Sequence, residues 1–164
     1  MTHVLETGFE AMEGENPNGS PKIRGYNIVN GQLTEAKDGA TYESRNPAWL
    51  DDCLGEFPLS TKEDVHAALH AARAAFPGWA ATPAPTRGQI IGNMGRLLME
   101  YKDDIVRVES REIGKTLKES GGEVQEAIDT CLFFQSEGRR LYGQTVNSEL
   151  PDKELFTYRR PLGV

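Results

Sequence analysis

The chain has 164 residues, about the length of one domain and enough to bury a core. Its formal net charge of −7 argues against a surface for nucleic acid or an anionic membrane, and no lysine- and arginine-rich run contradicts this. No apolar run approaches the roughly 20 residues of a membrane span. Residues 1–6 lack the pattern of a secretory signal, so we expect a cytoplasmic protein with Cys53 and Cys131 reduced.

The N-terminal part is predicted to contain a tail and small strands. Residues 1–24 are expected to be flexible, because residues 13–21 are polar, turn-rich and without periodicity. Asn30-Gly31 then lies between two β-prone runs and predicts a hairpin, because both turn positions must accept a positive φ. Residues 41–44 and 54–59 are expected to add further short strands.

Two helices are predicted next. The first begins at a capping box, Ser60 to Glu63, and ends at Pro77-Gly78. Its apolar stripe consists of Val65, Leu69, Ala72 and Phe76. The second begins near Pro85 and is expected to turn one apolar set inward: Ile90, Ile91, Met94, Leu97, Leu98 and Tyr101. Three glycines in it each cost about 1 kcal/mol relative to alanine, which close helix packing must offset: Gly88, Gly92 and Gly95.

Two more helices and one strand complete the chain. The third helix is expected to begin at Asp103 or Asp104 and to end at Gly114, where a left-handed backbone suits glycine. The fourth is expected to begin at a serine-to-glutamate capping pattern, residues 120–123, and to run to about Tyr142. Residues 155–160 predict one C-terminal strand. The apolar stripe of the fourth helix is Val124, Ile128, Cys131 and Leu132.

Local motifs give no catalytic chemistry. Gly114-Lys115-Thr116 imitates the end of a phosphate-binding loop, but Glu109 stands where that motif needs glycine and a helix precedes it. No G-x-G-x-x-G, zinc-type cysteine pairing or G-x-S-x-G occurs. His66 and His70 have metal-ligand spacing but no third ligand apart from Glu63, so a solvated helix face is the better interpretation.

A series of short motifs in a fixed order adds what periodicity does not. The series is Asn46-Pro47-Ala48, Ala75-Phe76-Pro77-Gly78-Trp79, Glu112-Ile113-Gly114-Lys115, Tyr142-Gly143 and Arg160-Pro161-Leu162-Gly163-Val164. Taken together, it resembles the N-terminal portion of the aldehyde dehydrogenase superfamily, from about residue 26 to the end. The resemblance implies an α/β fold, incomplete here, with small N-terminal β-hairpins, four helices and one C-terminal strand. It implies a tail over residues 1–24, part of the cofactor-binding domain over 25–143, and the start of an oligomerisation-arm strand over 144–164.

The family oxidises aldehydes to carboxylic acids with NAD or NADP, through a thiohemiacetal on a cysteine. The resemblance places that cysteine, the assisting glutamate and the cofactor-binding glycines beyond Val164, so neither Cys53 nor Cys131 is expected to be the nucleophile. The chain alone is therefore expected to be an inactive fragment that binds no cofactor. The complete enzyme is expected to take a small-molecule aldehyde and to be a homo-oligomer, with no nucleic-acid or membrane partner. The alternative is a non-catalytic helical interaction module.

The resemblance also implies two sets of site residues. Many members hold a monovalent cation beside the cofactor domain, and the corresponding groups are Glu112, Ser44 and the carbonyl of Arg45; a plain helix-terminal acid is the alternative for Glu112. The fourth helix borders the substrate entrance in the family. The candidate entrance residues are Glu126, Asp129, Thr130 and Phe133. An incomplete fold would leave the stripe of this helix short of partners, so the chain is expected to bind a hydrophobic dye.

Overall fold

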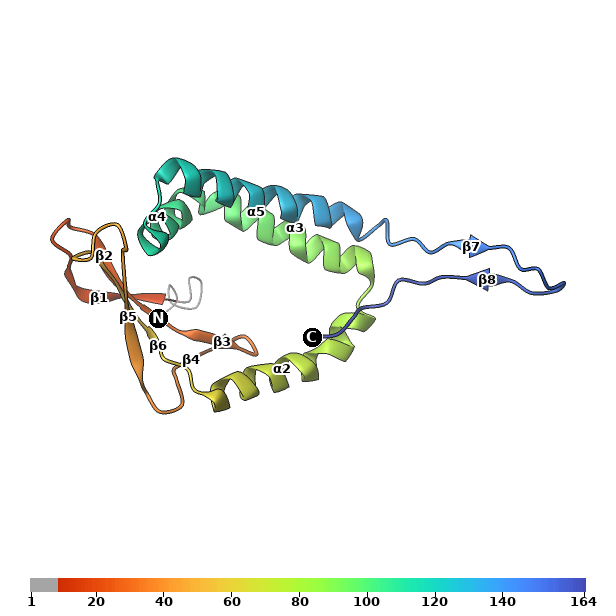
Figure 1. Ribbon diagram of the computed structural model, residues 1–164, viewed down its shortest axis with the longest axis horizontal. Helices are drawn as coiled ribbons and strands as arrows, with labels where there is room; N and C mark the ends of the chain where they lie inside the picture. Colours follow the sequence, from red (N-terminus) through yellow and green to blue (C-terminus); the bar gives the residue numbers. More distant parts are fainter. Residues whose placement is uncertain (1–8) are drawn as a thin grey trace.

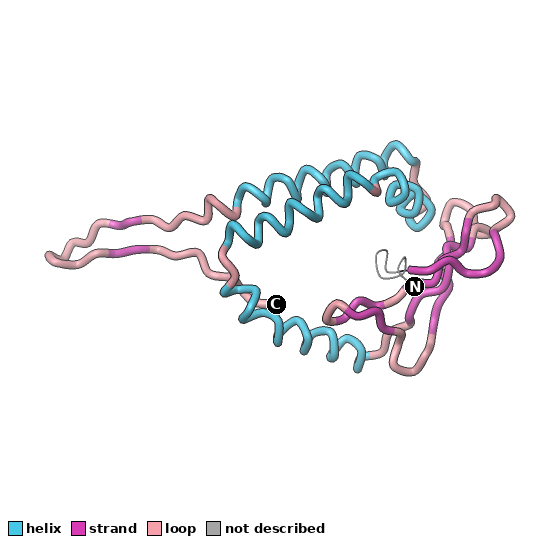
Figure 2. The backbone as a smooth tube through the Cα atoms, turned by 180° about the vertical axis from the view of Figure 1, so that it is seen from behind, coloured by secondary structure: helices cyan, strands magenta, loops and turns pink. Residues whose placement is uncertain are grey.

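The computed structural model describes residues 9–164, which form eight strands and four helices (Figure 1). The strands are β1 (Phe9–Glu15), β2 (Pro21–Gly25), β3 (Asn27–Val29), β4 (Gln32–Thr34), β5 (Thr41–Arg45), β6 (Cys53–Pro58), β7 (Thr145–Val146) and β8 (Leu155–Phe156). The helices are α2 (Lys62–Ala81), α3 (Ala84–Glu100), α4 (Lys102–Ile113) and α5 (Leu117–Glu137). Figure 2 shows the small sheets at one end, the helices in the middle, and the β7–β8 hairpin projecting from the other end. No helix within residues 9–164 is long and apolar enough to span a membrane.

A four-stranded sheet in the order β1-β2-β6-β5 forms the N-terminal end. β2 and β6 run parallel, and the outer pairs are antiparallel. Ile23, Cys53 and Leu54 supply its buried apolar side chains. Gly55 has a φ of +152°, and a Cβ there would collide with the backbone of Ile23 on the neighbouring strand. Glycine at this position therefore allows β2 and β6 to pair.

The prediction of a flexible tail is wrong for residues 9–24. These residues form β1, a turn and β2, and the tail's other residues, 1–8, lie outside the described part of the chain. The buried amide of Asn16 in the turn explains the difference. Its Nδ2 donates to the Cys53 carbonyl and its Oδ1 accepts from the Cys53 amide, each at 2.8 Å. The side chain of Asn16, one of the polar residues that suggested disorder, thus forms its hydrogen bonds with the backbone of β6, 37 residues further along the chain.

The expected hairpin is confirmed. β3 and β4 pair antiparallel around Asn30 and Gly31, whose φ angles are +52° and +72°. The strands expected over residues 41–44 and 54–59 appear as β5 and β6. The C-terminal strand is shorter than expected, because only Leu155–Phe156 pairs, with Thr145–Val146.

Helix α2 differs from its prediction at both ends. Its N-cap is Thr61 rather than Ser60, and Asp64 takes the place expected for Glu63: Asp64 Oδ2 accepts from the Thr61 amide at 2.7 Å. The helix also continues past Pro77 to Ala81. A reason lies in α3, where Arg87 Nη1 donates to the carbonyls of Trp79, Ala80 and Thr82 at 3.3, 3.2 and 2.6 Å. The Trp79 carbonyl also accepts from the Thr82 amide at 3.2 Å, and Arg87 adds bonds at the end of the helix, where helical donors run out.

Helix α5 begins and ends earlier than predicted. Its capping box is Thr116 with Glu119, so the serine-to-glutamate pattern at residues 120–123 lies inside the helix. It ends at Gly138, where a Cβ would lie 2.5 Å from the carbonyl oxygen of Ala84. The predicted end of α4 is confirmed: Gly114 is its C-cap, with a φ of +76°. The start of α4 is one residue earlier than Asp103.

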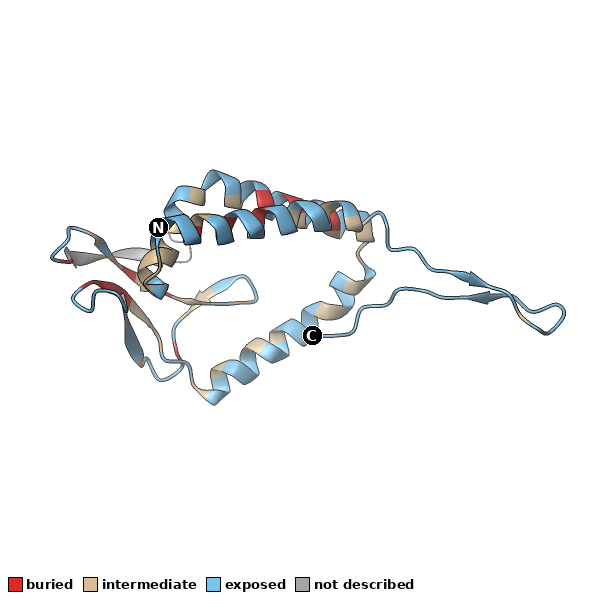
Figure 3. Ribbon diagram, turned by 45° about the horizontal axis from the view of Figure 1, so that its top comes forward, coloured by how far each residue is buried: buried red, intermediate tan, exposed pale blue. Residues whose placement is uncertain are grey.

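Helices α3 and α5 pack side by side, and the glycine prediction is confirmed (Figure 3). Gly88, Gly92 and Gly95 are buried residues of α3, and Val124 and Ile128 of α5 are buried opposite them. A Cβ on Gly95 would lie 2.9 Å from the Cβ of Cys131. The missing side chains thus allow a close approach, whose packing offsets the cost of glycine in a helix.

The apolar stripe of α2 and the set predicted to turn inward on α3 are mostly exposed. None of the residues of α2 is buried by the described part of the chain. On α3 the glycine face turns to α5, so four of the six residues predicted inward are exposed at 42–55%: Ile90, Met94, Leu97 and Tyr101. The stripe of α5, by contrast, buries Val124 and Ile128, and its exposed member is Leu132. The apolar surface without a partner therefore lies mainly on α2 and α3.

We expect the purified chain to enhance the fluorescence of anilinonaphthalene sulfonate strongly at neutral pH, because this dye binds exposed apolar surface. The measurement is a titration of dye against protein, with a complete aldehyde dehydrogenase of the same molarity as control. A monomeric chain that does not enhance the dye's fluorescence would show that the apolar faces of α2 and α3 are covered.

Candidate functional site

A groove of about 470 Å³ lies where the end of α2, the start of α3 and the end of α5 meet. Its lining is mainly apolar and aromatic and includes Trp79, Ile91, Phe133, Phe134 and Leu141. Phe133 and Phe134 pack edge to face with ring centroids 5.3 Å apart. A concave, mainly apolar surface of this kind suits an apolar group.

The structure brings together two of the four predicted entrance residues. Thr130 and Phe133 line the groove. Glu126 and Asp129 are exposed residues of α5 outside its lining, and Asp129 Oδ1 accepts from Gln125 Nε2 at 3.0 Å.

The two charged side chains of the groove are already engaged in hydrogen bonds. Arg87 donates to three backbone carbonyls, as described above, and Glu137 Oε1 accepts from Arg140 Nε at 2.9 Å. Arg87 thus binds the carbonyls at the end of α2, and Glu137 pairs with Arg140 at the end of α5. The groove is therefore better suited to an apolar group than to an anion.

The predicted cation ligands come from two elements that touch. Glu112 is an exposed residue in the last turn of α4, and Ser44 and Arg45 end β5, which contacts α4. The Arg45 side chain turns to Glu43 and to the Leu50 carbonyl, at 3.1 Å each from Nε and Nη1. The described residues contain no group of three histidine, cysteine, aspartate or glutamate side chains placed to hold a metal, and His66 and His70 are exposed on α2.

A buried ion pair that the sequence did not predict joins α4 to the sheet. Asp52 is 1% exposed and accepts two hydrogen bonds from Arg111, Nη2 to Oδ1 at 2.9 Å and Nε to Oδ2 at 3.1 Å. Ser20 Oγ and Asn46 Nδ2 also donate to it, at 2.9 and 3.2 Å. The hydrogen bonds from Arg111 hold the pKa of Asp52 below its usual value. The partners are separated by 59 residues, so no local spacing signals the pair.

Lys115 has a structural role. Its Nζ lies 2.8 Å from Glu109 Oε1 of α4 and also pairs with Glu123 of α5. The carboxylates of Glu109 and Glu123 raise the pKa of Lys115. As the sequence predicted, a helix precedes the Gly-Lys pair, so the lysine links two helices rather than closing a phosphate-binding loop.

Ser120 carries a buried hydroxyl with no hydrogen-bond partner among residues 9–164. Ser120→Ala is expected to raise the free energy of unfolding by about 1 kcal/mol, because alanine removes the unsatisfied group and favours the helix. Urea denaturation measures the change. Ser136→Ala, on the exposed part of α5, is the matched control, and its hydroxyl is bonded to Phe133 and Arg140. A loss of stability in Ser120→Ala would mean that this hydroxyl has a partner.

Comparisons with known proteins agree with this fold. The aldehyde dehydrogenase family model matches residues 33–164. The chain is 36% identical over 147 residues to the succinate-semialdehyde dehydrogenase (NADP(+)) GabD of Escherichia coli strain K12, covering 90% of this chain and 30% of that protein. It is 37% identical over 138 residues to an alpha-ketoglutarate semialdehyde dehydrogenase of Haloferax volcanii, covering 84% and 29%.

Solved structures show the same relationship. An NAD-dependent aldehyde dehydrogenase from Sinorhizobium meliloti matches with a TM-score of 0.80 and 26% identity, over 84% of this chain and 28% of that one. A betaine aldehyde dehydrogenase from Staphylococcus aureus in complex with NAD+ matches with a TM-score of 0.74 and 27% identity, over 79% and 26%. The protein is thus of the α/β class, with the aldehyde dehydrogenase type of fold over part of its length. It belongs to the aldehyde dehydrogenase family, and it spans about 30% of the length of the curated relatives.

The parallel strand pair within residues 9–164 differs from that of a doubly wound dinucleotide-binding fold. In doubly wound folds the dinucleotide site lies at the carboxyl ends of parallel strands, where a glycine-rich turn opens a helix. Within residues 9–164, β2 and β6 are the one parallel pair, and no glycine lies between the end of β6 and the start of α2. This strand pair therefore lacks the glycine-rich turn that is typical of doubly wound folds.

Proposed function

We propose that this chain forms the N-terminal part of an aldehyde dehydrogenase that oxidises an aldehyde to a carboxylic acid with NAD or NADP. The observation that carries the proposal is the family match over residues 33–164, which includes all four helices. The succinate-semialdehyde dehydrogenase of E. coli is named for NADP(+), and the S. aureus structure is a complex with NAD+. Both names support a nicotinamide cofactor for the complete enzyme.

Two surfaces are assigned within this function. Thr130 and Phe133, with Glu126 and Asp129 further out, are proposed to border the path of the aldehyde, supported by the apolar groove at Phe133. Glu112, Ser44 and the Arg45 carbonyl are proposed to hold a monovalent cation, supported by the contact between α4 and β5. Glu112→Gln in the complete enzyme is then expected to weaken activation by potassium, measured as rate against salt concentration.

The projecting hairpin, within residues 144–164, is proposed to join subunits of a homo-oligomer in the cytoplasm. Val146 and Phe156 are exposed on it, and within residues 9–164 its strands pair only with each other. Such free edges are suited to pairing with another chain. Residues 25–143 are proposed to be part of the cofactor-binding domain. A stand-alone interaction module is the weaker proposal, because α2 buries no residue against the described part of the chain.

We expect no aldehyde-dependent formation of NADH or NADPH by the purified 164-residue chain, because the nucleophile and dinucleotide site are proposed to lie in the rest of the fold. The measurement is nicotinamide absorbance with succinate semialdehyde, with the complete E. coli enzyme as positive control. A steady rate that tracks the concentration of this chain would refute the prediction.

A fusion tests the proposed function itself. In it, this chain replaces the matched portion of the E. coli succinate-semialdehyde dehydrogenase and is followed by the remainder of that enzyme. We expect the fusion to oxidise succinate semialdehyde with NADP+. A fusion that is inactive, or that does not fold, would contradict the proposal.

A further inference from the structure

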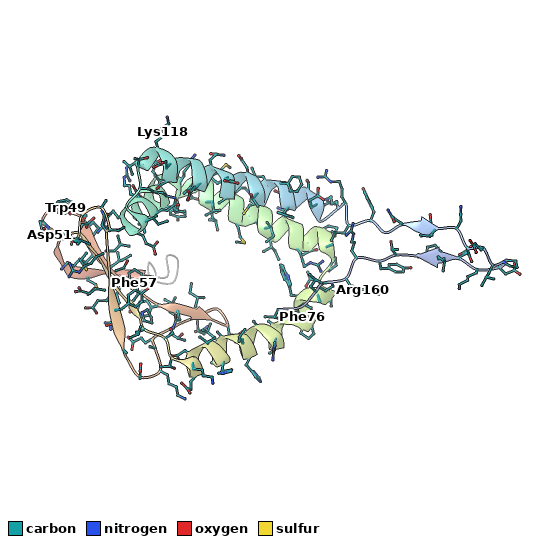
Figure 4. All side chains as sticks on the ribbon, viewed as in Figure 1. Trp49, Asp51, Phe57, Phe76, Lys118 and Arg160 are labelled. Atoms are coloured by element: carbon teal, nitrogen blue, oxygen red, sulfur yellow. The ribbon has the colours of Figure 1, made fainter. Side chains whose placement is uncertain are left out.

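The buried ion pair lies between the two elements that are proposed to hold the monovalent cation. Arg111 directly precedes Glu112 in the last turn of α4, and Asp52 directly precedes β6, the neighbour of β5 in the sheet. Helix α4 contacts both strands. Figures 1 and 4 show Trp49 and Asp51, on the loop that links β5 to β6, at the end of the molecule that carries α4. The pair is thus placed to set how Glu112 lies relative to the end of β5.

Asp52 holds the peptide group that carries the Arg45 carbonyl. The Asp52 carbonyl accepts from the Asn46 amide at 2.9 Å, and Asp52 Oδ2 accepts from Asn46 Nδ2 at 3.2 Å. The Asn46 amide and the Arg45 carbonyl belong to one planar trans peptide group, whose N–H and C=O point in opposite directions. The Arg45 carbonyl therefore points away from Asp52, and the bonds between Asp52 and Asn46 fix its direction.

Arg111 holds the last turn of α4 against the sheet. Its Nη2 and Nε bind both carboxylate oxygens of Asp52, and Nη2 also donates to the Pro21 carbonyl at 3.2 Å. A planar guanidinium that binds both oxygens of a carboxylate fixes orientation as well as distance, which a lysine ammonium does not. The last turn of α4, which includes Glu112, is therefore held in one orientation relative to β6.

Asp52 also offsets the charge of Arg111. A lone guanidinium one residue from Glu112 would repel a cation bound there. Because the Asp52 carboxylate is buried against the guanidinium, it cancels most of this repulsion and leaves the charge of Glu112 available. Glu112, Ser44 and the Arg45 carbonyl supply oxygen donors alone, and oxygen is the donor that replaces the hydration shell of potassium in proteins.

We propose that Asp52 and Arg111 are positioning residues for the monovalent cation, because they fix the direction of the Arg45 carbonyl and the orientation of the helical turn that carries Glu112. The inference rests on the proposed function. It goes beyond it by assigning the affinity for potassium to a pair that touches no ligand and whose partners are 59 residues apart.

Potassium titration of the fusion described above tests the proposal. The rate of NADPH formation and the melting temperature are each followed against potassium chloride, with tetramethylammonium chloride keeping the ionic strength constant. We expect Arg111→Lys to raise the half-saturating potassium concentration at least tenfold in both measurements. The rate at saturating potassium should change less than twofold, because the substituted residue contacts neither substrate nor cofactor.

Two further variants show whether the effect passes through the cation ligands. Arg107→Lys is the matched control, because its pair with Asp104 lies exposed on the same helix, and no change in the half-saturating concentration is expected. In a Glu112→Gln background, Arg111→Lys should raise this concentration less than twofold further, since the ligand that it positions is already lost. A purely structural role of Arg111 would give the same increase with and without Glu112.

Asp52→Leu combined with Arg111→Met keeps the proposal testable if Arg111→Lys does not fold. It replaces the buried pair with apolar groups, which is often neutral for stability, and is expected to raise the half-saturating concentration at least tenfold in a protein that is folded by circular dichroism. An unchanged concentration in the folded variants, or an equal rise in Arg107→Lys, would overturn the proposal. An inactive fusion contradicts the proposed function, whereas an active fusion whose response to potassium is independent of the pair contradicts this inference alone.

Discussion

Replacing the buried Asp52 with asparagine is expected to lower the free energy of unfolding by about 3 kcal/mol, because breaking a buried ion pair leaves a charge without its partner. Asparagine keeps the shape but offers one acceptor where Arg111, Ser20 and Asn46 all donate. Urea denaturation monitored by circular dichroism measures the loss. Asp104→Asn is the control, since its pair with Arg107 is exposed and is expected to contribute less than about 0.5 kcal/mol.

The effect of pH follows from the lowered pKa of Asp52. The folded state binds this proton less readily than the unfolded chain, so the carboxylate stabilises the fold fully above its unfolded pKa, about 3.9. This contribution is lost as the pH falls from there through the lower folded pKa. The difference in the free energy of unfolding between the unaltered protein and Asp52→Asn should therefore be largest near neutral pH and should shrink in acid. A difference that stays constant from neutral pH to pH 3 would contradict this role.

Gly88→Ala is expected to lower the free energy of unfolding by about 2 kcal/mol, because the added methyl group overpacks the contact between α3 and α5. This loss outweighs the preference of alanine for a helix. The added Cβ would lie 2.6 Å from the carbonyl oxygen of Gln135, which is backbone and cannot swing away. Thermal and urea unfolding measure the loss. Gly122→Ala in α5 is the control: nothing lies within 4 Å of its Cβ, so a gain of up to about 1 kcal/mol is expected.

Gly92→Ala can be compared with Gly88→Ala, because both substitutions add a methyl group next to Gln135. The Cβ added at Gly92 would meet the side chain of Gln135 rather than the backbone. The cost of Gly92→Ala should therefore fall when Gln135→Ala is combined with it, whereas the cost of Gly88→Ala should not. If Gln135→Ala relieved both variants equally, the close approach would not be as the structure places it.

Local chemistry predicted those features that depend on one or two residues. Asn30-Gly31 and Gly114 need left-handed backbone, and glycine or asparagine supplies it wherever the rest of the chain goes. The three glycines of α3 likewise indicated that another helix packs closely against α3, because glycine destabilises a helix and packing must compensate for this. The order of the motifs at residues 46–48 and 160–164 identified the family, which comparison confirmed.

Features that depend on distant contacts were not predictable in this way. Asn16 belongs to a polar run, and only its pairing with Cys53 turns that run into part of a sheet. Ser60 and Thr61 are both good helix caps, and the sequence does not decide between them. Pro77 ordinarily ends a helix, but Arg87 holds the carbonyls that follow it.

In the candidate site, too, the features that depend on contacts between distant segments were not predictable from the sequence. The groove at Phe133 forms only when α2, α3 and α5 meet, so spacing on α5 alone did not separate Thr130 and Phe133 from Glu126 and Asp129. The exposed stripe of α3 was predicted to be buried, because its periodicity reports an apolar face but not which partner covers it.

The most direct test of the central claim is the rate of NADPH formation from succinate semialdehyde by the fusion of this chain to the remainder of the E. coli enzyme. The fold described here predicts a rate proportional to the concentration of the fusion, and no rate from the remainder alone. A well-folded fusion that forms no NADPH would show that this chain does not supply the matched part of an aldehyde dehydrogenase.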